Sequence, residues 1–299
     1  MSSTSSVSPI DVYEAGLSGI NGTEKTVPIT GSGHLHALEQ LEILPQILQE
    51  GILFTGSGAA LLFQAALPSI REEISSGGHK KLAPELLNAL QAHISYILCL
   101  VFGTRTERLA LINLLRDREP PLLGGGHSIQ FAPNSNLQLW MAATIYATST
   151  DIYQRIYGRV DYNTAQHAYS EFTLLTNYLG IHPNTWPASR KAFWTYWDNQ
   201  IAQLTVSPDA VQFAKDLRES TDMPQWVQTM KPLLRGVTIE MLPPSLREAY
   251  ELRSTAITRA LYRTWMGFSV TLYPAMPKKW RSYPLRFYQD CLKEKLNVV

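Results

Sequence analysis

The segment from Pro84 to Phe102 constrains the fold most, because its apolar residues recur at helical spacing over several turns. Pro84 suits the first turn of a helix, and Gly103 suits the cap that follows the last turn. One apolar stripe runs along the segment and consists of Leu86, Leu90, Ile94, Ile97 and Val101. A helix with such a stripe must bury it against other elements. The segment therefore predicts a long helix in the interior of the protein.

Helical signals continue beyond this segment. Thr104 and Glu107 form a capping-box pattern at the start of a second helix, which must end before Pro120. Further helices are predicted over residues 137–157, 162–179, 188–204, 208–219 and 245–272. The sequence has neither a run of alternating strands nor an internal repeat. We therefore predict an all-α protein with one large helical domain over residues 36–299, preceded by a poorly ordered arm over residues 1–35.

The composition narrows the class of protein. The chain has 299 residues, of which 45% are apolar and 17% are charged. The charged share lies below the usual value of about 25%, which favours a large interior with an internal apolar pocket. The formal net charge of +1 gives no electrostatic basis for binding nucleic acid. The two cysteines provide neither a disulfide framework nor a cysteine metal motif.

The sequence predicts neither a secretory signal nor a transmembrane segment. Its N-terminus is polar, and the apolar stretch Gly51–Ile70 is interrupted by Gln64 and Pro68. We therefore expect a cytoplasmic protein. Residues 278–281 are basic around Trp280, and a solvated surface is the simpler interpretation of this pattern. The alternative is peripheral contact with an anionic intracellular membrane.

His93 is the first candidate catalytic residue, because it falls on the apolar stripe and faces the interior. The simplest interpretation is a core histidine that is hydrogen-bonded to a backbone carbonyl. The sharper interpretation is a metal ligand or an acid/base group that lines a cavity. Tyr96 is the second candidate, because it lies about one helical turn further on and would sit beside His93.

Glu119 is the third candidate catalytic residue. It precedes Pro120 at the end of the charged run 116–119, where a surface carboxylate is the simpler interpretation. Its position before Pro120 predicts a helix end that faces a loop. The sequence has no Gly-x-Ser-x-Gly nucleophile elbow, which argues against a common hydrolase.

Five segments carry a family resemblance in their order and spacing. They are Gly58–Pro68, Phe102-Gly103-Thr104, Trp140, Leu179-Gly180 with Pro187, and Leu242–Arg247. The first is similar to Gly-x-Ala-Leu-Leu-x-Gln-x-x-His-Pro and the last to Leu-Pro-x-x-Leu-Arg. Together they resemble the MpaB and rubber oxygenase superfamily over roughly residues 50–250.

The resemblance implies an all-helical fold with haem b, and oxidative cleavage of carbon–carbon double bonds in polyisoprene or in prenylated metabolites. In the family, a histidine on the helix after Phe-Gly-Thr holds the iron, and a basic residue and a threonine lie on the helix before it. The corresponding positions here are Glu119, Ala92 and His93, and Leu67 replaces the histidine before the first proline. Haem requires a strong axial donor such as His, Cys or Tyr. Glutamate is a poor replacement.

Three functions stay open on the sequence. The first is an oxygenase-like enzyme of specialised (secondary) metabolism that acts on an apolar molecule of terpenoid or polyketide type, with His93 as the axial ligand of the iron where haem b is bound. The second is a haem-free cyclase, isomerase or dehydratase that uses His93 and Glu119 as an acid/base pair. The third is a non-catalytic protein that binds a hydrophobic metabolite.

Overall fold

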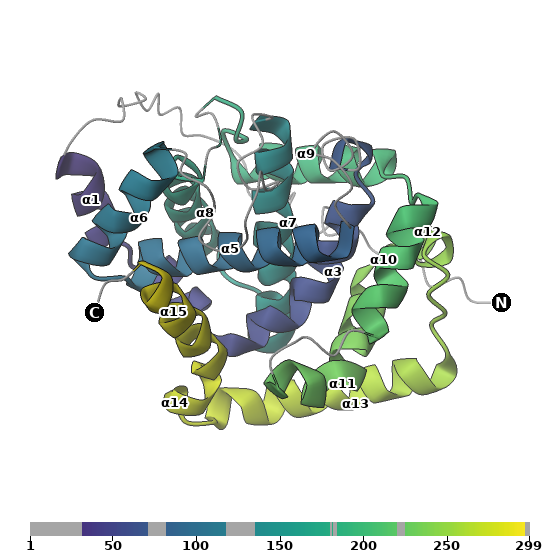
Figure 1. Ribbon diagram of the computed structural model, residues 1–299. Coiled ribbons are helices and arrows are strands. Elements are labelled where there is room, and N and C mark those ends of the chain that lie inside the picture. Colours follow the sequence, from purple (N-terminus) through teal and green to yellow (C-terminus); the bar gives the residue numbers. More distant parts are fainter. Residues whose placement is uncertain are drawn as a thin grey trace.

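The computed structural model describes residues 32–70, 82–117, 135–179, 181, 184–219 and 225–296, and the regular elements within these ranges are all helices (Figure 1). The predicted all-α class is therefore confirmed. The predicted N-terminal arm lies almost wholly outside the described residues. The first helix, α1 (Ser32–Glu39), begins within the predicted arm because its Leu35 and Leu38 are buried.

Two long helices, α5 (Leu82–Phe102) and α7 (Ser135–Tyr157), cross in the middle of the molecule (Figure 1). Their largest fully buried side chains include Leu86 and Leu100 on α5 and Trp140 on α7. Among the described residues, α5 is the one helix that is long and apolar enough to cross a membrane. However, 67% of its most apolar window is buried within the protein. It is accordingly the core helix that its apolar stripe predicts.

A short apolar helix, α3 (Ser57–Ala65), follows the 3-10 helix η2 (Gly51–Gly56) and packs against both long helices. Side chains from distant segments bond to its last turn. The indole of Trp140 donates to the backbone carbonyl of Phe63 at 3.2 Å. The hydroxyl of Tyr250 donates to the backbone carbonyl of Leu62. The Leu62 carbonyl also accepts from the backbone amide of Ala66 at 3.1 Å, and carbonyls at a helix end commonly lack partners within the helix. These two side-chain bonds therefore fix the end of α3 in the core.

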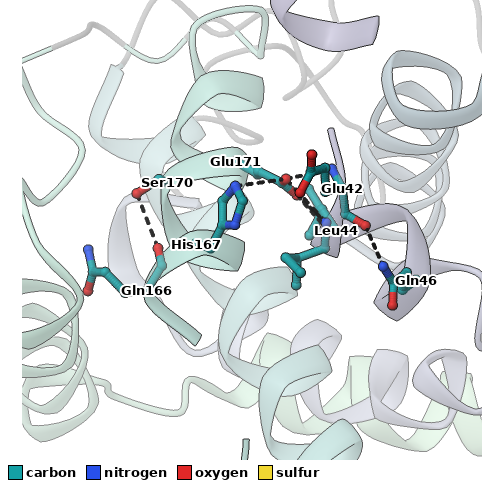
Figure 2. Close-up of polar contacts among 8 residues, drawn as sticks. Glu42, Leu44, Gln46, Gln166, His167, Ser170 and Glu171 are labelled. Carbon is teal, nitrogen blue, oxygen red and sulfur yellow. Dashed lines mark hydrogen bonds and ion pairs between the residues drawn. The ribbon is translucent and has the colours of Figure 1, made fainter. Parts of the chain in front are cut away.

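The short helix α2 (Ile43–Leu48) is capped by a carboxylate from another helix (Figure 2). Glu171 on α8 (Tyr162–Thr176) is buried, and it accepts hydrogen bonds from the backbone amides of Glu42 at 2.7 Å and Leu44 at 2.6 Å. Both of its oxygens also lie 3.2 Å from the amide nitrogen of Ile43. Pro45 lacks an amide hydrogen, so it stands in the first turn of α2 without leaving a donor unpaired.

Several predicted helices are confirmed with small shifts at their ends. They are α5, α6 (Arg105–Asp117), α7, α8, α9 (Arg190–Gln203) and α10 (Pro208–Glu219). The capping box at the start of α6 is also confirmed, since the Thr104 amide donates to the Glu107 carboxylate at 2.7 Å and the Glu107 amide donates to the Thr104 hydroxyl at 3.3 Å.

The helix predicted over residues 245–272 is two helices, α12 (Pro244–Ala249) and α13 (Ala256–Leu272). The chain leaves α12 through a Schellman motif, in which the Leu252 amide donates to the Arg247 carbonyl and the Glu251 amide donates to the Glu248 carbonyl. Glu251 takes the left-handed position with φ of 57°, which glycine usually occupies. Because no glycine marks this turn, the sequence did not predict the break.

Helix α11 (Gln225–Met241), which contains Pro232 in its interior, was not predicted from the sequence. After α13 the chain continues through the 3-10 helix η4 (Tyr273–Ala275), α14 (Lys278–Arg281) and α15 (Tyr283–Leu296). The last of these packs on α5, α6 and η2, so the end of the chain returns to elements near its beginning (Figure 1).

Candidate functional site

A groove of about 1020 Å³ lies between α5 and α11, and α3, α10 and α15 complete it. Apolar side chains line most of it: Phe54, Leu61, Leu62, Leu87, Leu90, Ile94, Leu217, Val227, Leu234, Ile239 and Leu252. Charged side chains also reach it, and they are Asp216, Arg218, Glu219, Lys231 and Arg235. The volume is at the upper end of the range for small-molecule sites, about 300–1,000 Å³.

The groove depends on a close approach between α3 and α11 at Gly58. A Cβ atom at this glycine would lie 2.2 Å from the side-chain oxygen of Thr238. That hydroxyl is held in place, because it donates to the carbonyl of Leu234 at 2.8 Å. Gly58 is therefore the residue that lets α3 form the floor of the groove beneath α11.

One wall of the groove comes from the C-terminal helix. Tyr288 on α15 stacks on Phe54 of η2, with ring centroids 4.9 Å apart and an interplanar angle of 5°. Both residues line the groove. Residues more than two hundred positions apart in the chain thus meet at this edge.

His93 is buried, and both of its ring nitrogens have partners. Nδ1 lies 2.8 Å from the carbonyl oxygen of Ala89, and Nε2 lies 3.1 Å from the side-chain amide of Gln138 on α7. A carbonyl only accepts, so Nδ1 carries the proton. Burial lowers the pKa of His93 below its usual 6.5, which favours the neutral ring. Nε2 of the neutral ring then carries no proton, so it would accept a hydrogen bond from the NH₂ group of Gln138 and not from Oε1, the atom that lies 3.1 Å away.

His93 and the groove lie on different faces of α5. Leu87, Leu90 and Ile94 face the groove, and His93 lies about 90° around the helix from their centre at 100° per residue. The neutral ring with its Nδ1 proton on a carbonyl is the arrangement that metal-bound histidines use. However, Nε2 meets Gln138 and not the groove. The position matches the core histidine of the simpler interpretation.

The other two predicted site residues do not join His93 in a described site. Tyr96 is buried, and its hydroxyl has no hydrogen-bond partner among the described residues; burial raises its pKa to about 12. Tyr96 does not line the groove. Glu119 lies outside the described residues. Of the family positions, Ala92 is fully buried and Leu67 is half-buried.

The structure adds a buried polar cluster that the sequence did not reveal. The guanidinium of Arg281 on α14 donates to the carboxylate of Glu50 and to the hydroxyl of Tyr157, each at 2.8 Å. Tyr273 accepts from the amide of Ile52 at 3.1 Å beside this pair. The sequence favours a solvated basic surface at Arg281, but this side chain turns inward and pairs with the buried carboxylate of Glu50. The cluster anchors α14 and α15 to η2.

The groove was also missed, since α11 was not predicted. A signal for it exists, because Val227, Leu234 and Thr238 recur at helical spacing and all face the groove. Pro232 interrupts that pattern. The described residues contain no group of three or more His, Cys, Asp or Glu side chains that could hold a metal ion.

The all-helical fold and the sequence match agree on a class of protein. The chain belongs to the family described as ER-bound oxygenase mpaB/B'/rubber oxygenase, catalytic domain, whose family model matches residues 44–271. The suspected relationship to this family is therefore confirmed. Helices α14 and α15 lie beyond the matched residues.

Two curated relatives are uncharacterized proteins of Mycobacterium bovis and Mycobacterium tuberculosis. Each is 26% identical to this chain over 162 residues, which make up 53% of this chain and 63% of the relative. The chain thus spans less than two thirds of the length of these relatives. No solved structure matches the chain.

Proposed function

We propose that this protein is an oxygenase-type enzyme of specialised metabolism that binds an apolar terpenoid or polyketide-type substrate in the groove between α5 and α11. Membership of an oxygenase catalytic-domain family supports the reaction class. The observation that carries the binding site is the groove itself, about 1020 Å³ with an apolar lining from α3, α5 and α11. Such a lining favours a molecule that gains by leaving water.

Haem b stays a prediction from the family resemblance. The described residues do not fit a haem at His93, because Gln138 occupies Nε2 and the groove does not adjoin the ring. The described lining of the groove contains no histidine or cysteine. The position of the family's axial ligand is Glu119, which the structure does not describe.

The acid/base alternative requires His93 and Glu119 to meet the substrate. His93 is neutral, buried and turned toward α7, so its described surroundings do not favour this role. The third alternative, a protein that binds a hydrophobic metabolite without converting it, would use the same groove. Turnover separates it from the enzyme.

The binding site is tested by filling the groove. Leu87 and Ile94 are half-buried on the groove face of α5, and Ile94→Trp would occupy space that a ligand needs. Leu109→Trp is the matched control, because Leu109 is exposed on α6 outside the groove. We expect Ile94→Trp to raise the Kd of a terpenoid or polyketide ligand at least about tenfold. This corresponds to a loss of roughly 1.4 kcal/mol of apolar contact. The control should bind normally.

Circular dichroism must show that both variants are folded, and incubation with oxygen followed by mass spectrometry then reports turnover. A ligand that binds both variants equally would exclude the groove. Binding without any oxygenated product would favour the non-catalytic alternative.

The visible spectrum after expression with added haem tests the role of His93. Any Soret band of the wild type should persist in His93→Ala, because the Nε2 atom of His93 already faces Gln138. A band that is present in the wild type, lost in His93→Ala and retained in Glu119→Ala would show that His93 is the axial ligand and that our assignment is wrong.

A further inference from the structure

Positive charge is concentrated near the C-terminus of this nearly neutral chain. The stretch from Leu252 to Gln289 contains seven lysines and arginines and no aspartate or glutamate. They are Arg253, Arg259, Arg263, Lys278, Lys279, Arg281 and Arg286. The whole chain carries a formal charge of +1, so the rest of it carries −6. Of the seven, Arg281 is engaged with Glu50, and the other six side chains are exposed.

Exposed apolar side chains are concentrated in the same stretch. Among the described residues, nine large hydrophobic side chains are exposed, and seven of them lie between Ile257 and Tyr283. They are Ile257, Leu261, Phe268, Val270, Leu272, Trp280 and Tyr283. Ile257 is 73% exposed and Trp280 is 68% exposed, so these side chains are not part of the core. A cluster of this kind marks an interaction surface.

The cluster lies along one edge of the molecule. Helix α13 runs along the lower border in Figure 1, and α14 continues that border toward α15. Ile257, Leu261, Phe268 and Leu272 recur at spacings that share one face of α13. The face that packs on the protein is a different one, where Ser269 is buried and the Tyr262 hydroxyl accepts from Arg155 at 2.7 Å.

Acidic side chains near α13 are already paired. Glu240 accepts a hydrogen bond from Ser254 at 2.6 Å and lies 3.8 Å from Arg247, and Asp151 lies 2.9 Å from Arg155. The carboxylates of Glu240 and Asp151 therefore do not neutralise the exposed lysines and arginines of α13 and α14. On α13, Arg259 and Arg263 lie on the side of the helix away from the apolar face at 100° per residue. The edge is therefore both apolar and positive, with Lys278 and Lys279 of α14 adding charge beyond the end of α13. We call the exposed side chains of α13 and α14 listed above the α13–α14 edge.

We propose that the α13–α14 edge docks on an anionic lipid bilayer. The apolar side chains enter the boundary between headgroups and acyl chains, while the lysines and arginines meet lipid phosphates and carboxylates. Trp280 and Tyr283 suit this interfacial depth, since aromatic rings with a polar tip are enriched there. A second copy of the chain is a poorer occupant, because two edges of the same positive charge repel each other.

This inference rests on the exposed surface and not on the proposed chemistry. Co-sedimentation of the full chain with vesicles tests it, using phosphatidylcholine alone and phosphatidylcholine with about 30% phosphatidylserine. We expect binding to the anionic vesicles, weaker binding at high salt and little binding to the neutral ones.

Two groups of substitutions separate the contribution of positive charge to vesicle binding from that of the apolar side chains. Lys278→Gln with Lys279→Gln should lower the partition coefficient about 30-fold, at about fivefold for each basic residue. Arg159→Gln with Lys191→Gln is the control, because both side chains are exposed and lie outside α13 and α14, Arg159 between α7 and α8 and Lys191 on α9. Ile257→Ser, Leu261→Ser and Phe268→Ser together should abolish binding, whereas Leu109→Ser, an exposed apolar residue on α6, should not change it.

Two outcomes would overturn the proposal. One is vesicle binding that is absent, or that the control substitutions weaken as much as those on the edge. The other is a dimer in light scattering that the triple serine variant converts to a monomer while vesicle binding is unchanged, which would assign the edge to a second copy of the chain. Melting curves by circular dichroism establish that each variant is folded.

Discussion

At the scale of single residues, Gly58 is the clearest case in which one position shapes the candidate site. It belongs to the segment Gly58–Pro68 that carries much of the family resemblance. The structure explains its requirement for glycine by the missing Cβ, which would otherwise lie 2.2 Å from the Thr238 hydroxyl oxygen. The motif thus describes the packing of α3 under α11, and packing is compatible with more than one chemistry.

Gly58→Ala should lower the free energy of unfolding by about 1–3 kcal/mol, the usual cost of overpacking a well-packed contact. The same substitution in a Thr238→Ala background should be neutral or stabilising, because the oxygen is gone and alanine is favoured over glycine within a helix by up to about 1 kcal/mol. Urea unfolding of the four proteins in the cycle measures this coupling. Equal losses in both backgrounds would mean that another contact makes the glycine necessary.

His93 makes a prediction about pH. Its folded-state pKa is lowered by burial, so below about pH 6.5 the unfolded chain takes up a proton that the folded protein does not. Stability is therefore retained above this pH and lost as the pH falls, by at most about 1.4 kcal/mol per pH unit for one proton. Unfolding at pH 5 and pH 7.5 should differ less in His93→Asn than in the wild type. The exposed-residue control His36→Asn should retain the wild-type difference.

At the scale of elements, α2 depends on a carboxylate from a distant helix. Glu171→Gln keeps the shape of the side chain, but it replaces one of the two acceptor oxygens with an amide nitrogen that faces the backbone amide of either Glu42 or Leu44. We expect a loss of about 2–3 kcal/mol, as for hydrogen bonds to a charged group. Denaturant unfolding measures it. Glu248→Gln also removes a carboxylate, but from an exposed position, and should change stability little. A similar loss of stability in Glu171→Gln and Glu248→Gln would show that the change in net charge, and not the lost hydrogen bond, causes the effect.

Local signals decide which elements could be predicted. Helix α10 matches its predicted range of 208–219 because Ser207 and Pro208 form a strong start signal, and the Ser207 hydroxyl indeed accepts from the Ala210 amide at 3.2 Å. The break after α12 was hidden, because Glu251 occupies a left-handed position that sequences usually mark with glycine. Helix α11 was hidden by Pro232. In each failure, tertiary contacts outweigh the local preference.

In the candidate site, too, features set by local sequence could be predicted and features set by tertiary contacts could not. The interior position of His93 follows from helical spacing and is confirmed. The engagement of its Nε2 by Gln138 could not be predicted, because the partner lies 45 residues away on another helix. The groove likewise depends on how α3, α5 and α11 pack. Periodicity predicts which face of a helix is buried, but it does not predict which helices leave space between them.

At the scale of the whole molecule, the chain closes on itself through the cluster of Glu50 and Arg281, which lie 231 positions apart. The side chain of Glu50 is 6% exposed and that of Arg281 is 12% exposed. Together with the stack of Tyr288 on Phe54, this contact holds α15 as a wall of the groove. The wall lies beyond residues 44–271, which match the family model. Under the proposed function, the ligand preference of this chain would depend partly on residues outside the matched region.

Breaking the contact on one side should affect both ends of the chain. Arg281→Met leaves the Glu50 carboxylate buried without its cation, which should cost about 3–5 kcal/mol. Glu50→Gln combined with Arg281→Met removes both charges and should recover part of that loss. Arg259→Met, an exposed arginine on α13, is the control for losing a positive charge.

Hydrogen exchange should accelerate together in η2, α14 and α15 of the Arg281→Met variant, because these elements share one contact. Acceleration confined to α14 would show that the wall of the groove is held by the Phe54–Tyr288 stack instead. In that case Tyr288→Ala, and not Arg281→Met, should change which ligands bind.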